Sequence, residues 1–202
     1  MRKSSLIALI ILVLVVAYFF DNIRGYYRFK ELCDQEKLQQ VTNKLERDVG
    51  WQIDLNKPSN EYSALVIASL PYVRFVRFVS LTDKKLYDMY YVGKSERLAE
   101  ILLDPRSRGD WQRDYEISPA DLKNPVMYQW SQFEEALPTE VRTSRYGEKI
   151  VDLRSGKVVL SLTNIGYDTF DRNHTLLDAP SGNTCEWYNA MWRNQKFLSV
   201  FQ

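Results

Sequence analysis

Histidine and cysteine are nearly absent from this chain of 202 residues, which has one histidine, His174, and two cysteines, Cys33 and Cys185. A single histidine excludes any multi-histidine metal site contained within the chain. Two cysteines exclude zinc and iron–sulfur sites that need three or four thiolates from one chain. Acidic and basic residues nearly balance, and the net charge is +1. The chain therefore lacks the excess of positive charge that would indicate nucleic-acid binding. With 45% hydrophobic and 26% charged residues, the composition is that of a folded chain.

The motifs of several enzyme classes are also missing. The sequence has no glycine-rich phosphate-binding loop, no G-x-S-x-G nucleophile elbow and no C-x-x-C redox pair. The nearest approach to a catalytic constellation is Asp168, Asp171 and His174, which are spaced by three residues. This spacing is compatible with a small metal site, but it favours a polar loop between the last strand and the final helix. We therefore expect no catalytic residue, no metal ion and no cofactor.

The most uneven feature of the sequence is an apolar run of 15 residues, Leu6 to Phe20, in a chain whose mean hydropathy is −0.37. Arg2 and Lys3 precede the run. Residues 4–23 supply the roughly 20 residues that a transmembrane helix needs. The sequence therefore predicts a single membrane-spanning helix at residues 4–23.

This helix would be an uncleaved signal anchor at residues 1–23, followed by a periplasmic domain at residues 24–202. The basic N-terminus favours a cytoplasmic start, and long C-terminal domains are translocated largely regardless of their charge. We therefore expect a single-pass protein of the bacterial inner membrane. A cleaved signal peptide and a soluble core helix are the alternatives.

Aromatic residues gather where the apolar run ends, and aromatic belts are typical of membrane–water interfaces. The expected interface residues are Tyr18, Phe19, Phe20, Tyr26 and Tyr27.

The two cysteines add an argument about the compartment. If the domain is exported, its surroundings are oxidising, and a disulfide between Cys33 and Cys185 is the default expectation. Such a bridge would close a loop of most of the domain, which the chain-entropy model values at about 5 kcal/mol. Two buried free thiols are the alternative.

A second aromatic group lies near the C-terminus, on a helix expected to begin after Thr184. If Cys185 is tied to Cys33, this helix would lie close to the membrane and contact the bilayer or a partner's transmembrane segment. The expected contact residues are Trp187, Trp192, Phe197 and Phe201, for which core packing is the alternative.

Residue patterns along the rest of the chain predict an α+β fold, with an antiparallel sheet and flanking helices behind the one N-terminal transmembrane helix. Gly156 allows the positive φ of a tight hairpin turn. The expected strands are residues 72–81, 86–92, 140–146, 149–153 and 158–167. The expected helices are residues 22–36, extending toward 49 unless a strand forms near Val41, and residues 95–103 and 128–136. Residues 104–125 are expected to be surface loops.

The segment Tyr26-Tyr27-Arg28-Phe29-Lys30-Glu31-Leu32-Cys33 resembles the opening of small uncharacterised envelope proteins of gram-negative bacteria. The later hairpin at residues 151–159 and a second cysteine near the C-terminus are similar too, although Glu186 follows Cys185 where that group has a proline. The resemblance implies an α+β envelope domain with a Cys33–Cys185 link. It implies no activity.

Together these observations favour a non-enzymatic accessory or assembly subunit of an inner-membrane complex. Its partners would be the lipid bilayer and a membrane or periplasmic protein, with no role for nucleic acid. A periplasmic metal- or carboxylate-dependent hydrolase and a ligand-sensing envelope domain are the alternatives.

Overall fold

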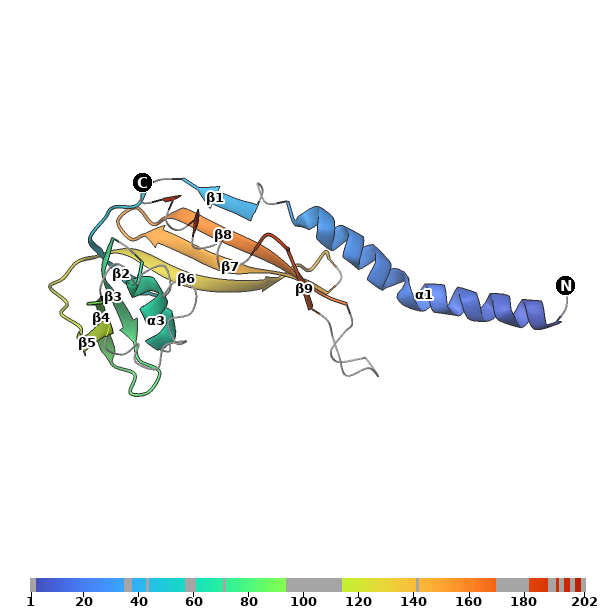
Figure 1. The fold of residues 1–202 in the computed structure, drawn as a ribbon, viewed down its shortest axis with the longest axis horizontal. Coiled ribbons are helices and arrows are strands. Elements are labelled where there is room, and N and C mark those ends of the chain that lie inside the picture. Colours follow the sequence, from blue (N-terminus) through green and yellow to red (C-terminus); the bar gives the residue numbers. More distant parts are fainter. Residues whose placement is uncertain are drawn as a thin grey trace. The chain divides into compact units, whose positions relative to one another are not determined.

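A computed structural model describes most of the chain, and β-strands are its main element (Figure 1). The described residues are 3–34, 38–42, 44–56, 61–70, 72–93, 114–140, 142–169, 182–188, 192, 195, 196, 199 and 200. The helices are α1 (Lys3–Leu32) and α3 (Glu61–Ala68). The strands are β1 (Gln39–Val41), β2 (Val49–Ile53), β3 (Val73–Val79), β4 (Leu86–Tyr91), β5 (Tyr115–Pro119), β6 (Val126–Ala136), β7 (Thr143–Asp152), β8 (Lys157–Asp168) and β9 (Gly182–Thr184).

The nine strands of the described part belong to one mixed sheet, in the order β1-β8-β7-β6-β2-β3-β4-β5, with β9 also paired to β8. Strand β2 runs parallel to both of its neighbours, β3 and β6. The pairs β3–β4, β4–β5, β1–β8 and β8–β9 are antiparallel. The expectation of an antiparallel sheet is therefore wrong at its centre. Parallel neighbours need a crossover, and α3 lies in the crossover from β2 to β3.

The chain divides into two compact units. The first contains residues 1–38, 134–147 and 163–187, and the second contains residues 39–133, 148–162 and 188–202. The boundary expected between residues 23 and 24 is untested, although α1 itself continues through it.

The core of the second unit forms around β2. Trp51 on this strand is fully buried, and its ring lies 5.4 Å from that of Tyr128 on β6. Helix α3 packs on β3 and β4 and buries Leu65 and Ile67. Strand β3 has four consecutive buried residues, Phe75 to Phe78, so it has buried side chains on both of its faces.

Three segments of this unit differ from the sequence-based expectations. Residues 128–136 form part of strand β6 rather than a helix, because Tyr128 and Trp130 are two residues apart and both are buried, which is the period of a strand. The helix expected to extend toward residue 49 is replaced by β1 and β2, so the alternative strand near Val41 is confirmed. The end of the expected loop region pairs with β4 as strand β5. The helix expected at residues 95–103 lies outside the described residues.

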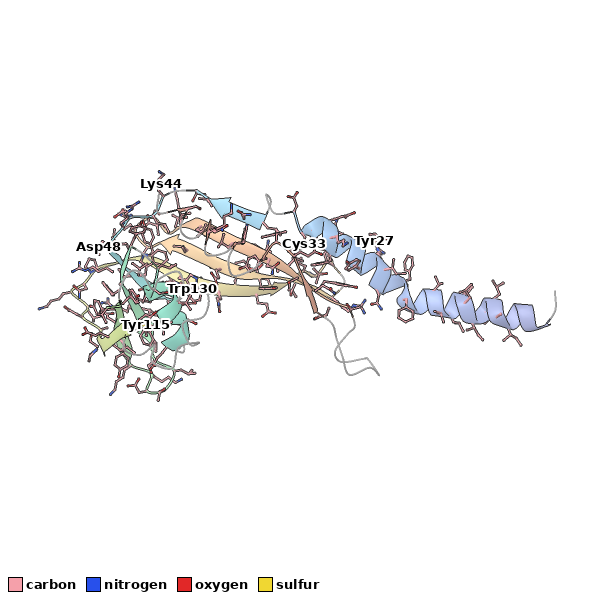
Figure 2. All side chains as sticks on the ribbon, in the orientation of Figure 1. Tyr27, Cys33, Lys44, Asp48, Tyr115 and Trp130 are labelled. Atoms are coloured by element: carbon pink, nitrogen blue, oxygen red, sulfur yellow. A yellow bond between two sulfur atoms is a disulfide. The ribbon has the colours of Figure 1, made fainter. Side chains whose placement is uncertain are left out.

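Helix α1 of the first unit carries the apolar run. Its side chains from Ile7 to Val16 stand exposed around the helix (Figure 2). In the described part of the chain, no helix is both long and apolar enough to cross a bilayer. The expected transmembrane helix at residues 4–23 is therefore wrong. Ser4, Ser5, Asp21 and Asn22 are polar, so the uninterrupted apolar part of the expected span covers only about 22 Å of helix axis, against a hydrocarbon core of about 30 Å.

A buried ion pair joins β3 to β4 in the second unit. Arg77 and Asp88 are direct cross-strand neighbours, and Arg77 donates two hydrogen bonds of 2.8 Å to the carboxylate. Arg77 also donates to the carbonyl of Asp121, whose own N–H donates to Asp88. The hydrogen bonds to Asp88 raise the pKa of Arg77. The pair therefore holds the segment after β5 against the sheet.

We expect Asp88→Asn to destabilise the protein by about 3–5 kcal/mol, because it leaves the buried Arg77 charge without its counter-ion. The matched control is Glu135→Gln, which removes an ion pair between Arg145 and Glu135 that is about half exposed. This control should cost less than about 1 kcal/mol. Denaturant unfolding of the full chain in mild detergent measures the free energy of unfolding of both variants. An equal decrease in the two variants would contradict the structural role of the buried Arg77–Asp88 pair.

Candidate functional site

The C-terminal half of α1 docks on the strands of the first unit through one stripe of its surface. Asn22, Gly25, Phe29 and Cys33 recur every three or four residues, so they share one face of the helix. The partner of three of them is the buried Tyr167 on β8. Its hydroxyl donates to the carbonyl of Asn22 at 3.0 Å, and its ring stacks on Phe29 at 5.8 Å. At Gly25 a Cβ atom would come within 2.8 Å of the same ring.

A disulfide fixes the end of this stripe. Cys33, which Figure 2 labels at the end of α1, is bonded to Cys185 across a sequence separation of 152 residues, as the sequence predicts. Cys185 is buried, and its N–H donates to the side-chain oxygen of Asn164. Trp187 donates its indole N–H to the carbonyl of Cys33 at 3.1 Å. The end of α1 is therefore held both covalently and by a hydrogen bond.

A cavity of about 310 Å³ lies beside the disulfide. On the helix side its lining includes two aromatic rings, Tyr26 and Phe29, and the Lys30 ammonium lies 4.9 Å from the centre of the Tyr26 ring. The lining residues are Tyr26, Phe29, Lys30, Cys33, Asn183, Thr184, Cys185, Glu186 and Trp187. We call it the disulfide-side cavity. The lining therefore combines three aromatic rings with one lysine, one glutamate and neutral polar side chains.

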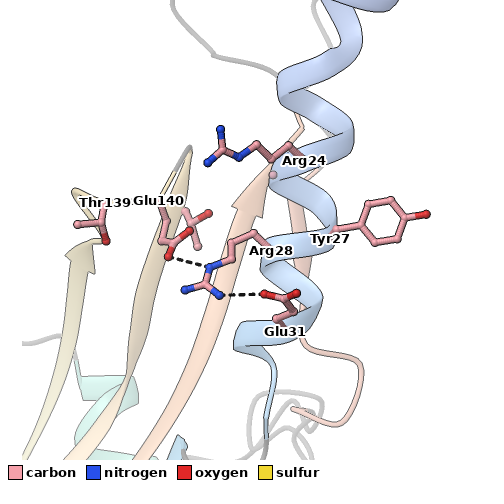
Figure 3. A pocket seen from close by; sticks show the side chains of 8 residues that line it. Arg24, Tyr27, Arg28, Glu31, Thr139 and Glu140 are labelled. Atoms are coloured by element: carbon pink, nitrogen blue, oxygen red, sulfur yellow. Dashed lines mark hydrogen bonds and ion pairs between the residues drawn. The ribbon is translucent and has the colours of Figure 1, made fainter.

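A larger cavity of about 560 Å³ lies between α1 and the turn from β6 to β7 (Figure 3). Its lining residues are Arg24, Gly25, Tyr27, Arg28, Glu31, Thr139, Glu140 and Thr143. We call it the arginine cavity.

Two carboxylates hold one of the arginines of this cavity. Arg28 donates from Nε to Glu140 at 2.9 Å and from a terminal nitrogen to Glu31 at 2.8 Å. The hydrogen bonds to Glu31 and Glu140 raise the pKa of Arg28. This cluster was not among the sites expected from the sequence. The spacing of Arg24, Arg28 and Glu31 on one helix was a visible signal, but Glu140 lies 112 residues beyond Arg28 and had none.

Of the expected membrane-interface aromatics, Phe19, Phe20, Tyr26 and Tyr27 are exposed, and Tyr27 is 67% exposed. The side chain of Tyr18 lies outside the described residues. Exposure is compatible with a membrane interface but does not test it, so these assignments stay predictions.

The expected C-terminal contact residues are only partly described. Trp187 is half-buried beside the disulfide. Trp192 packs against the core of the second unit, and the ring of Tyr188 lies tilted against it with the ring centres 5.3 Å apart. Phe197 and Phe201 lie outside the described residues. Contact with a membrane or partner through this group is untested.

The alternative hydrolase site is also largely outside the described residues. Asp168 is the last residue of β8, while Asp171 and His174 are not described. Among the described residues, no three histidine, cysteine, aspartate or glutamate side chains lie close enough to hold a metal ion together.

Comparisons with known proteins add nothing to this geometry, because no protein family, curated protein or solved structure matches the chain.

We expect Cys33→Ser/Cys185→Ser to destabilise the protein by about 5 kcal/mol, since removal of the bridge frees a loop of 152 residues in the unfolded chain. For a chain of this size, the melting temperature should fall by about 10–20 °C. Thermal unfolding with and without reductant measures the effect. The double variant should be insensitive to reductant, and an unchanged melting temperature of the reduced wild type would contradict the prediction.

We expect Gly25→Ala to destabilise the protein by about 1–3 kcal/mol, because the added methyl group overlaps the buried Tyr167 ring. Within a helix, Gly→Ala normally stabilises by about 1 kcal/mol. The sign of the change in stability therefore tells whether Gly25 packs on Tyr167. Gly182→Ala is the control, since its Cβ would meet Asp168 at an ordinary 3.5 Å. An increase in melting temperature for Gly25→Ala would show that α1 does not pack on Tyr167.

Proposed function

We propose that this protein is a non-enzymatic accessory or assembly subunit of a bacterial envelope complex. In this proposal the chain is exported, acquires its disulfide in an oxidising compartment, is attached to the membrane through α1 and contacts a partner protein beside the disulfide.

The disulfide is the observation that carries the proposal. Structural disulfides persist in secreted and periplasmic proteins and are rare in the cytosol of mesophiles. Cys33 and Cys185 are the only cysteines of the chain, and both are used in this bond. The bond also lies where α1 meets the strands of the first unit, so loss of oxidation would release the helix that carries the apolar run.

The exposed apolar side chains of α1 support attachment to a membrane. Ten described side chains illustrate this: Ile7, Leu9, Ile10, Ile11, Leu12, Val13, Leu14, Val15, Val16 and Phe20 are each between 46% and 64% exposed. A contiguous apolar surface of this kind is costly in water and marks a site of membrane or protein contact. Contact with lipid would remove that cost.

The disulfide-side cavity supports the role of an accessory subunit. Aromatic residues are enriched where proteins bind one another, and Tyr26 and Trp187 form part of its lining. Tyr26 is 39% exposed, so it is accessible to a partner.

Site-directed photo-crosslinking in intact cells tests this proposal. We expect a photoreactive phenylalanine analogue at Tyr26 to form one discrete adduct with a second envelope protein. The same analogue at Leu122, which is 75% exposed and lies in the second unit, should form none. In acid-trapped samples from the same cells, Cys33 and Cys185 of this protein should both be oxidised and should not react with a thiol reagent.

The two parts of the proposal fail separately in this experiment. Free thiols at both cysteines would contradict export. Oxidised protein without an adduct at residue 26, or with the same adduct from residue 122, would contradict the accessory role.

A further inference from the structure

The arginine cavity begins where the exposed apolar surface of α1 ends. Phe20 and Ile23 are 55% and 54% exposed, and Arg24 follows them directly in the helix. One helical turn contains 3.6 residues, so the apolar surface and the cavity are within about 6 Å of each other along the axis. A ligand that reaches both must be apolar at one end and polar at the other.

The two arginines of the cavity differ in what they contact. Arg28 is held by Glu31 and Glu140, whereas Arg24 makes no hydrogen bond or ion pair with any described residue. Figure 3 shows the Arg24 guanidinium on the side of the helix that carries Arg28, while Tyr27 projects to the opposite side. An unpaired guanidinium beside an open cavity leaves its planar fork of donors available to an oxyanion.

We propose that the arginine cavity binds the headgroup of a phospholipid, with its phosphate on Arg24 and its acyl chains along the apolar surface of α1. Guanidinium groups bind phosphate oxygens through two parallel hydrogen bonds. The exposed hydroxyl of Thr139, across the cavity, adds a further donor.

The charges of the cavity favour a headgroup that also carries an ammonium group. Arg28 neutralises the charge of only one of its two carboxylate partners, Glu31 and Glu140. The remaining negative charge balances the positive charge of Arg24. A free phosphate dianion or a purely anionic headgroup would be repelled by the surplus carboxylate. In the phosphoethanolamine headgroup, the ammonium lies a few bonds from the phosphate and would face Glu31, which is 67% exposed. The cavity therefore selects an ethanolamine phospholipid.

This inference rests on the membrane attachment proposed above, but it predicts a particular residue rather than attachment in general. Arg24 would position the headgroup, while the apolar side chains of α1 would supply most of the attachment. Removal of Arg24 should therefore change which lipid is retained far more than whether the protein binds vesicles.

Native mass spectrometry of the full chain in mild detergent tests the site, with phosphatidylethanolamine or phosphatidylglycerol added. We expect wild-type protein to retain one phosphatidylethanolamine molecule and Arg24→Gln to lose about tenfold in retention, because a charge-assisted contact is removed. Arg145→Gln is the control, since it removes an equally charged, 46% exposed side chain of the same unit that does not line the cavity. It should retain the lipid as the wild type does.

Vesicle flotation is measured on the same three proteins, so that each failure has a distinct meaning. Wild-type protein that does not float would contradict the membrane attachment of the proposed function. Protein that floats but retains lipid equally with and without Arg24 would overturn the headgroup site alone. Equal retention of phosphatidylglycerol, or complete displacement by inorganic phosphate, would overturn the assignment to an ethanolamine phospholipid.

Discussion

The bond between Cys33 and Cys185 is the constraint on which the arrangement of the first unit depends. It joins the end of α1 to the segment that follows β9, and the buried amide of Cys185 is held in turn by Asn164. Because the bond lies at the end of the docking stripe, it keeps Phe29 on Tyr167. Both cavities of this unit take one wall from the same turns of α1, so the packing of this stripe sets the shape of both.

Helix α1 consequently presents three different surfaces over its last three turns. One is buried on Tyr167, one carries Arg24 and Arg28 toward the turn between β6 and β7, and one carries Tyr26 and Lys30 toward the disulfide. The first surface is structural, which leaves the other two for ligands. We assign the arginine side to lipid and the disulfide side to a protein partner because their chemistry differs. The former is lined by two arginines and two glutamates, whereas the latter is lined by three aromatic side chains together with Lys30 and Glu186.

Local sequence patterns predicted those strands whose partners are close in the chain. Strands β3, β4 and β8 and the turn at Gly156, where φ is +67°, follow from β-branched and aromatic residues next to turn residues. Strand β6 was expected to be a helix, because its polar residues concealed the two-residue spacing of Tyr128 and Trp130. Strand β2 has only five residues, and no turn residues separate it from the helical pattern that precedes it. Its pairing with two parallel strands that are distant in the sequence decided its structure.

The sequence alone determined that the two cysteines could pair only with each other, where the apolar run lies and that common catalytic motifs are absent, because each depends on residue identity and count. Tertiary structure decided that the sheet is mixed, that Arg28 meets Glu140 and that Arg24, one helical turn earlier, pairs with no described residue. Those outcomes depend on which distant segments lie together, since a hydrogen bond or an ion pair forms only between groups within a few ångströms. No local pattern around Arg24 distinguishes it from Arg28, and only the position of the turn before β7 makes one a structural residue and the other a candidate ligand-binding residue.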